Sequence, residues 1–73
     1  MPAGSIYNLA DLLKKTGRVE EAIPLFREEL EGCREVNGAT HEETLDSARN
    51  LATVLDESGR GKMAARLRSE YGV

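Results

Sequence analysis

The sequence contains no tryptophan, one phenylalanine and a single cysteine. A single cysteine cannot form an internal disulfide, and Cys33 has no second cysteine or nearby histidine with which to bind zinc. We interpret Cys33 as a small core residue and expect no structural metal and no cofactor. An intermolecular disulfide and a redox-active thiol remain alternatives for this residue. One unpaired cysteine is typical of the cytoplasm or of another reducing soluble compartment, an organelle included.

Clusters of basic residues and long apolar runs are also missing. The chain has 10 basic and 13 acidic residues, a formal net charge of -3, and the two signs are interspersed. Nucleic acids select clustered Lys and Arg with interleaved aromatic residues, so we expect no nucleic-acid partner. No run approaches the roughly 18 apolar residues that a membrane span needs, so we expect no membrane insertion.

The length of 73 residues leaves room for one domain with a small core. Chains below about 70 to 80 residues commonly rely on disulfides, a metal or a partner for their stability. Because the first two are not offered by this composition, we expect a homo-oligomer or a subunit of a larger complex.

An internal repeat is the strongest pattern in the sequence. Residues 8–30 match residues 50–72 at a spacing of 42, and nine of these 23 pairs are identical. Chance at average composition gives roughly one or two identities. A period of this size is typical of helical solenoids. The identical pairs are Asn8/Asn50, Leu9/Leu51, Ala10/Ala52, Leu13/Leu55, Gly17/Gly59, Arg18/Arg60, Ala22/Ala64, Leu25/Leu67 and Glu28/Glu70.

Apolar residues within each unit recur at i, i+3, i+4 and i+7, which is the period of an amphipathic helix. This spacing predicts a helix ending before Gly17 and three more over residues 19–36, 41–58 and 61–71. The fold class is therefore all-α, with antiparallel helical hairpins stacked as a short solenoid of about four helices.

The turns between these helices carry their own patterns. Gly17 and Gly59 are predicted to end helices in the left-handed conformation, which glycine adopts without a Cβ penalty. Thr40 and Glu43 have the spacing of a capping box, with Thr40 as the N-cap and Glu43 reaching back to its amide.

Together these features resemble the tetratricopeptide repeats of kinesin light chains and their relatives. The resemblance implies a single domain over residues 1–73, with repeat one at about 5–37, a loop at 37–40 and repeat two at about 41–73. Glu29 stands where the family usually has alanine, so we expect looser packing around it. The motifs that carry the resemblance are Asn8-Leu9-Ala10, Gly17-Arg18-Val19-Glu20-Glu21-Ala22, Pro24-Leu25-Phe26, Gly38-Ala39-Thr40-His41 and Asn50-Leu51-Ala52.

The resemblance also implies a function, namely a non-catalytic module that binds a peptide or partner protein through a concave surface. That surface is lined by the first helix of each unit. Asn8 and Asn50 are the foremost candidates, because a carboxamide both donates and accepts and can pair with a peptide bond. The assigned residues are Tyr7, Asn8, Asp11, Lys14 and Lys15 in the first unit, and Asp46, Arg49, Asn50, Thr53, Asp56 and Glu57 in the second.

Charge refines this assignment. Arg49 is suited to a ligand carboxylate in fork geometry. Lys14 and Lys15 are expected at one end of the surface and Asp56 and Glu57 at the other, which would favour a ligand of mixed charge.

Each of these assignments has a structural alternative. Asn8 and Asn50 can instead hydrogen-bond the adjacent helix, and the charged residues can form a solvated face. His41 is interpreted as a helix-start residue with a capping role, since no second histidine follows at the zinc-protease spacing. No serine, cysteine or threonine has a base and an orienting group at a defined spacing, so we expect no enzyme activity.

The array is short, which leads to an alternative function. Repeat proteins generally need at least three units to bury a continuous core, and this sequence holds fewer than two. The chain is then a structural small subunit or a homo-oligomer whose open faces are completed by assembly, with Ile6, Tyr7, Val36 and Tyr71 near the contact. The start at residues 1–5, without the loop that precedes the family's first helix, suggests an origin in a longer array.

Overall fold

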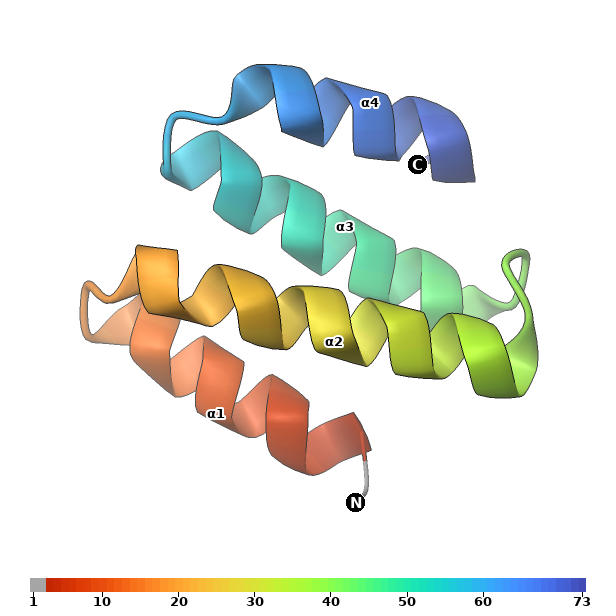
Figure 1. The fold of residues 1–73 in the computed structure, drawn as a ribbon, viewed down its shortest axis with the longest axis horizontal. Helices are drawn as coiled ribbons and strands as arrows, with labels where there is room; N and C mark the ends of the chain where they lie inside the picture. The colour runs from red at the N-terminus through yellow and green to blue at the C-terminus, as the bar shows by residue number, and fades with distance from the viewer. Residues whose placement is uncertain (1–2) are drawn as a thin grey trace.

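The computed structural model describes the backbone of residues 3–73 and the side chains from residue 8 onward. This range contains four α-helices: α1 (Ala3–Lys15), α2 (Val19–Asn37), α3 (Glu42–Glu57) and α4 (Gly61–Tyr71). Figure 1 shows α1 and α2 as one antiparallel hairpin and α3 and α4 as a second. The prediction of an all-α fold with four helices is confirmed, and α4 has the predicted bounds.

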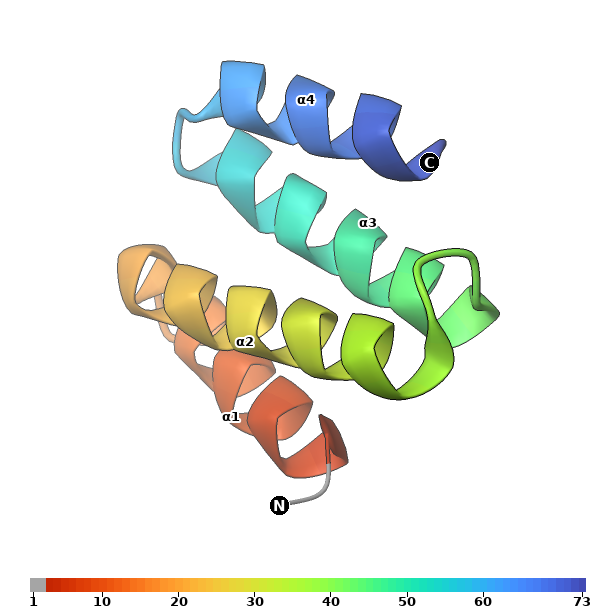
Figure 2. The same cartoon turned by 45° about the vertical axis from the view of Figure 1, so that its right-hand side comes forward.

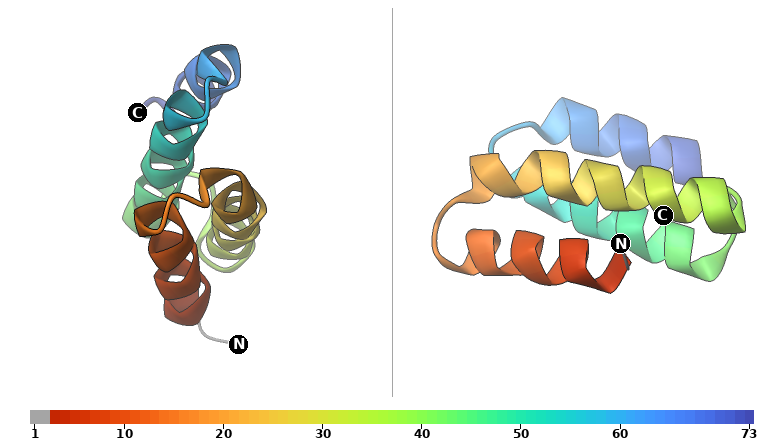
Figure 3. Two further views of the ribbon diagram at one scale, coloured as in Figure 1. Left: turned by 90° about the vertical axis from the view of Figure 1, so that its left-hand side faces the viewer. Right: turned by 60° about the horizontal axis from the view of Figure 1, so that its bottom comes forward.

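The helices stack in chain order. α1 packs on α2, α2 on α3, and α3 on α4. Figure 2 shows α1 and α4 at opposite ends of this stack. In the left view of Figure 3, α1 and α3 lie in line, with α2 beside them. The first helices of the two hairpins therefore share one side of the molecule.

Gly17 and Gly59 end the first helix of each hairpin. Their φ angles are 82° and 80°, in the left-handed region that glycine adopts without steric cost. The amide that follows each glycine donates to the carbonyl five residues back at 2.7 Å, and the glycine amide donates to the carbonyl three residues back. This pair of bonds is the Schellman arrangement, so the predicted role of both glycines is confirmed.

The start of α3 differs from the prediction. Its first residue is Glu42 and its N-cap is His41, whose Nδ1 accepts a hydrogen bond from the Glu43 amide at 3.1 Å. The prediction that Thr40 is the N-cap is wrong, because the helix begins one residue too late for that capping box. The Glu43 carboxylate instead accepts a hydrogen bond from Asn37 Nδ2 at 3.2 Å. The capping role predicted for His41 is confirmed.

Buried alanines lie at the contacts between neighbouring helices. Five of them have no exposed surface, and four of these five belong to the identical pairs of the repeat. A small side chain lets two helix backbones approach closely, which explains why these positions match between units. The fully buried alanines are Ala10, Ala22, Ala48, Ala52 and Ala64, and the larger core residues are Ile23, Phe26, Leu30, Leu51, Val54 and Leu55.

Cys33 and Glu29 project from α2 into its contact with α3. Cys33 is buried, as predicted for a core residue, and its Sγ lies 3.5 Å from Ser47 Oγ. Ser47 also hydrogen-bonds the Glu29 carboxylate, whose buried Oε2 has no partner. Burial raises the pKa of Glu29, and the hydrogen bond from Ser47 offsets part of that rise. Glu29 Oε2 is thus a buried, unsatisfied oxygen, and the looser packing expected around Glu29 stays a prediction.

Candidate partner-binding surfaces

The predicted binding residues lie on two polar stripes, one on α1 and one on α3. Their spacing of three and four residues places each stripe on one side of its helix, and most of the side chains are exposed. Lys14 Nζ of α1 lies 3.3 Å from Glu57 Oε1 of α3, so the two stripes approach each other at the carboxyl ends of these helices. We call this surface the α1–α3 face, and its residues are Asn8, Asp11, Lys15, Asp46, Arg49, Asn50 and Thr53. The side chain of Tyr7, predicted for the same surface, lies outside the described residues.

The charges are not separated as predicted. Lys14 and Glu57 were expected at opposite ends of the surface, but they form an ion pair. Asp56 lies toward α4, with its Oδ2 2.6 Å from Arg68 Nη2. The prediction of an electrically split surface is therefore wrong. The reason is that α1 and α3 run in the same direction (Figure 1), so the last turns of the two helices, which carry Lys14 and Glu57, meet at the same end of the molecule.

Charged residues on the α1–α3 face are paired within their own helices. Lys15 Nζ lies 2.8 Å from Asp11 Oδ2, and Arg49 Nη1 lies 2.7 Å from Asp46 Oδ1. Exposed pairs of this kind contribute little to stability, so a ligand can share or replace a partner at small cost.

The two asparagines differ from these charged residues. Neither Asn8 nor Asn50 makes a side-chain hydrogen bond to another residue in the described part of the chain. Asn8 is exposed and Asn50 is half-buried. Both carboxamides therefore keep their donors and acceptors for water or a ligand. The alternative in which they hold the neighbouring helix has no support in these contacts.

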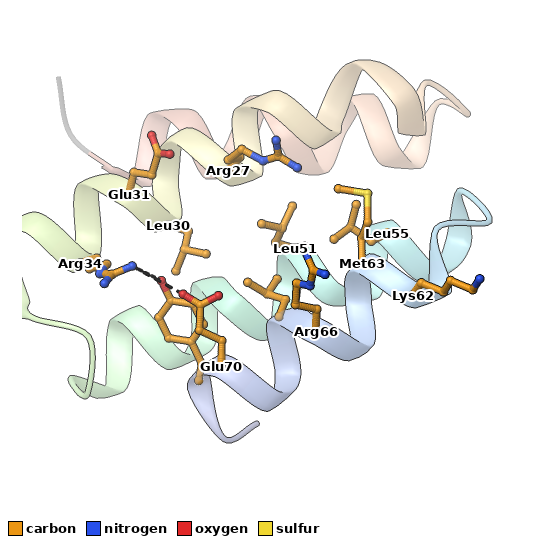
Figure 4. Close-up of a pocket in the computed structure, with 12 residues that line it drawn as sticks. Arg27, Leu30, Glu31, Arg34, Leu51, Leu55, Lys62, Met63, Arg66 and Glu70 are labelled. Carbon is orange, nitrogen blue, oxygen red and sulfur yellow. Dashed lines mark hydrogen bonds and ion pairs between the residues drawn. The ribbon is translucent and has the colours of Figure 1, made fainter.

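A second candidate surface is a groove of about 470 Å³ between α2 and α4, which we call the α2–α4 groove. Figure 4 shows side chains from both helices lining this space. Its volume lies within the roughly 300 to 1,000 Å³ typical of ligand pockets. Its apolar lining consists of Leu30, Leu51, Leu55, Met63, Leu67 and Tyr71.

Polar bridges join α2 to the α4 segment on either side of this groove. Arg60 donates two hydrogen bonds of 2.8 Å to the two carboxylate oxygens of Glu20. These bonds hold the pKa of Glu20 below its usual range. At the other end, Arg34 Nη1 donates to the Tyr71 hydroxyl at 3.3 Å and lies 3.7 Å from the Glu70 carboxylate. The groove stays open between the two bridges.

Sequence reasoning missed the α2–α4 groove. Lys62 and Arg66 are four residues apart on α4, which places them on one side of that helix. Arg27 lies across the groove from Lys62 and Arg66. It is separated from them by 35 residues or more in the sequence, and no local pattern links it to them. Only the stacking of the two hairpins brings these side chains to one site.

The apolar residues predicted near an assembly contact have different surroundings. Val36 is 82% exposed at the end of α2. Tyr71 is half-buried and lines the α2–α4 groove. The side chains of Ile6 and Tyr7 lie outside the described residues. Val36 therefore remains available to a partner, whereas Tyr71 already contacts Arg34.

The residues that the structure describes contain no group of three or more His, Cys, Asp or Glu arranged to hold a metal ion. None of the described helices combines the length and apolar character that crossing a bilayer requires.

Two antiparallel hairpins related by a 42-residue repeat, with open polar and apolar surfaces, define a helical repeat protein of the solenoid class. The chain belongs to the tetratricopeptide repeat family, whose model matches residues 3–67. Comparisons with curated proteins and with solved structures gave no match. Members of this family are typically non-catalytic and generally mediate protein interactions, so membership indicates a protein–protein interaction module.

Proposed function

We propose that the α1–α3 face binds a peptide or an extended segment of a partner protein. The observation that carries this proposal is the pair of carboxamides of Asn8 and Asn50, at equivalent positions of the two units, which have no hydrogen-bond partner among the described side chains. A carboxamide can both donate to and accept from a peptide bond of any sequence. α1 and α3 share one side of the molecule (Figure 3). Since Asn8 and Asn50 occupy equivalent positions of these two helices, they would contact successive parts of one bound chain.

Charged residues of the same face add selectivity. Arg49 contacts the exposed carboxylate of Asp46, and its guanidinium has further donors for a ligand carboxylate. Asp11 and Lys15 form a pair on α1 that offers both signs of charge to a ligand. Thr53 lies one turn beyond Arg49 and continues the stripe on α3. A segment of mixed charge suits this arrangement.

In this proposal residues 5–37 and 41–73 act as two repeat units, each contributing one first helix to the binding face. The 42-residue spacing supports the kinesin-light-chain type of repeat. The loop at 37–40 then serves as the connection between units and takes no part in binding.

The test starts from random peptides displayed on phage and selected on the wild-type chain. We expect Asn8→Ala combined with Asn50→Ala to weaken the best peptide at least about tenfold, since each lost hydrogen bond contributes about 1 kcal/mol. Titration calorimetry measures the affinity. Glu28→Ala combined with Ser69→Ala, two exposed positions on α2 and α4, serves as the control and should leave the affinity unchanged. Wild-type affinity in the asparagine double variant would contradict the proposal.

A second candidate is assembly, in which the chain is a structural subunit or a homo-oligomer. The observation that favours it is the exposure of two leucines on α1, with Leu9 48% and Leu12 57% exposed. If copies of the chain cover this surface, sedimentation should show mass rising with concentration, and Leu9→Glu combined with Leu12→Glu should abolish that rise. A monomer that melts cooperatively at every concentration would rule out self-assembly.

A further inference from the structure

The positive charge that is left unneutralised within the chain gathers at one place. Of the ten basic residues, seven form ion pairs. The other three, Arg27, Lys62 and Arg66, have no ion pair or side-chain hydrogen bond within the described part of the chain. All three line the α2–α4 groove. Among the side chains that the structure describes, the cations without an internal partner thus line this groove, in a chain whose net charge is -3.

The floor between these cations is apolar. Leu51 and Leu55 of α3 form part of it, together with Leu30 of α2. Met63 is 46% exposed at the groove, although most large apolar residues of α2 and α3 are buried. Leu30, Leu51 and Leu55 are at most 4% exposed, so the apolar surface that an occupant removes from water lies on Met63 and on the half-buried Leu67 and Tyr71.

The cations lie on both sides of this floor. Arg27 projects from α2 and Arg66 from α4, as Figure 4 shows, and Lys62 is one turn before Arg66. At the far end of the groove, Arg34 is already engaged by Tyr71 and Glu70. Glu31, one turn after Arg27 on α2, also lines the groove, so its open, positively charged half is the half near the start of α4.

We propose that the α2–α4 groove docks an acidic amphipathic helix of a partner protein. The apolar stripe of that helix seats on Met63 and Leu67, above the buried leucines of the floor, and carboxylates on both edges of the stripe pair with Arg27 and Arg66. A helix presents an apolar stripe flanked by two acidic edges, whereas a strand alternates its side chains between two faces. This inference goes beyond the α1–α3 face, because it uses a different surface and a different occupant.

A designed peptide serves as the probe, because the natural partner is unidentified. It is a fluorescent helical peptide with leucines at i, i+3, i+4 and i+7 and glutamates along both edges of that stripe. Two control peptides replace every glutamate with glutamine or every leucine with alanine. Fluorescence anisotropy at low salt should show binding of the first peptide and affinities at least about tenfold weaker for both controls, since each control removes one of the two complementary features.

Variants locate the binding site. Arg27→Glu combined with Arg66→Glu should weaken the acidic peptide at least about tenfold, because two attractions become repulsions. Lys15→Glu combined with Arg49→Glu changes the net charge equally on the α1–α3 face and should leave this affinity within about twofold. All four positions are exposed, and circular dichroism confirms that each variant is folded.

Three results would overturn the proposal. Equal losses in the two double variants would mean that the peptide senses total charge and not the groove. If the glutamine peptide binds as tightly as the acidic peptide, the cations of the groove do not contribute to binding. Displacement of the peptide by an oligothymidylate at equal concentration would identify a general polyanion site. Asn8→Ala combined with Asn50→Ala should leave the affinity for the acidic peptide unchanged. The proposal for the α2–α4 groove can therefore fail or hold independently of the proposal for the α1–α3 face.

Discussion

The helices α1 and α3 carry the same apolar pattern but bury it to different extents. Leu51 is 3% exposed, whereas its equivalent Leu9 is 48% exposed. Val54 is fully buried, whereas its equivalent Leu12 is 57% exposed. The difference comes from their neighbours, because α3 packs against α2 and α4 and α1 packs extensively against α2 alone.

This comparison shows what a repeat pattern specifies. The pattern encodes a helix with an apolar stripe, and the position of that helix in the stack decides how much of the stripe is buried. A unit at the end of a solenoid therefore presents apolar side chains that an internal unit conceals. Substitutions at three pairs of equivalent positions in the two units test this conclusion.

The largest difference is expected between Leu51→Ala and Leu9→Ala. Removing the buried leucine leaves a cavity and should lower the free energy of unfolding by about 3 kcal/mol. Removing the exposed leucine should lower it by about 0.5 kcal/mol. Urea denaturation followed by circular dichroism measures both. Equal effects would contradict the comparison, and an effect of Leu9→Ala that grows with protein concentration would show that Leu9 is buried between copies of the chain.

The helix-ending glycines should behave alike in the two units. Gly17→Ala and Gly59→Ala both place a Cβ in the left-handed conformation, and a Cβ at either position meets no atom within 4 Å. Each change should therefore cost about 1 kcal/mol for backbone strain alone. Thermal or urea unfolding of the two variants should agree within about 0.5 kcal/mol. A much larger loss at one glycine would mean that its turn also depends on tertiary contacts.

Glu29 and Tyr71 form the third matched pair, at equivalent positions of α2 and α4. The Tyr71 hydroxyl has a partner in Arg34, whereas Glu29 Oε2 is buried without one. Because burial raises the pKa of Glu29, the folded state binds a proton more tightly than the unfolded state. Glu29 therefore stabilises the folded wild-type chain at pH values below the usual carboxyl pKa. This contribution is lost as the pH rises through the raised pKa of Glu29.

Glu29→Gln should therefore stabilise the chain by about 0.5 kcal/mol at neutral pH, by removing a buried charge with an unsatisfied oxygen. The gain should shrink as the pH falls through the raised pKa of Glu29. Urea unfolding of wild type and variant at several pH values measures this difference. A gain that does not change with pH would mean that packing, and not ionisation, is responsible.

Much of the fold could be predicted from the sequence, because its determinants are local. The period of the apolar residues predicted four helices, and Gly17 and Gly59 marked two of the turns. The error at Thr40 was local too, since His41 provided a side-chain acceptor one residue nearer the helix start. The outcome for the α1–α3 face is mixed: helical spacing placed its residues on common sides, but the relation of charges between helices was wrong.

The sequence by itself determined the helices, their glycine ends and the family, because these depend on residues close together in the chain. Only the tertiary structure decided which copy of each repeated leucine is buried and which charges meet. Lys14 with Glu57, and Glu20 with Arg60, are partners because two hairpins stack in the same direction. The α2–α4 groove arises in the same way: its walls lie on different hairpins, and its cations come together only when those hairpins pack.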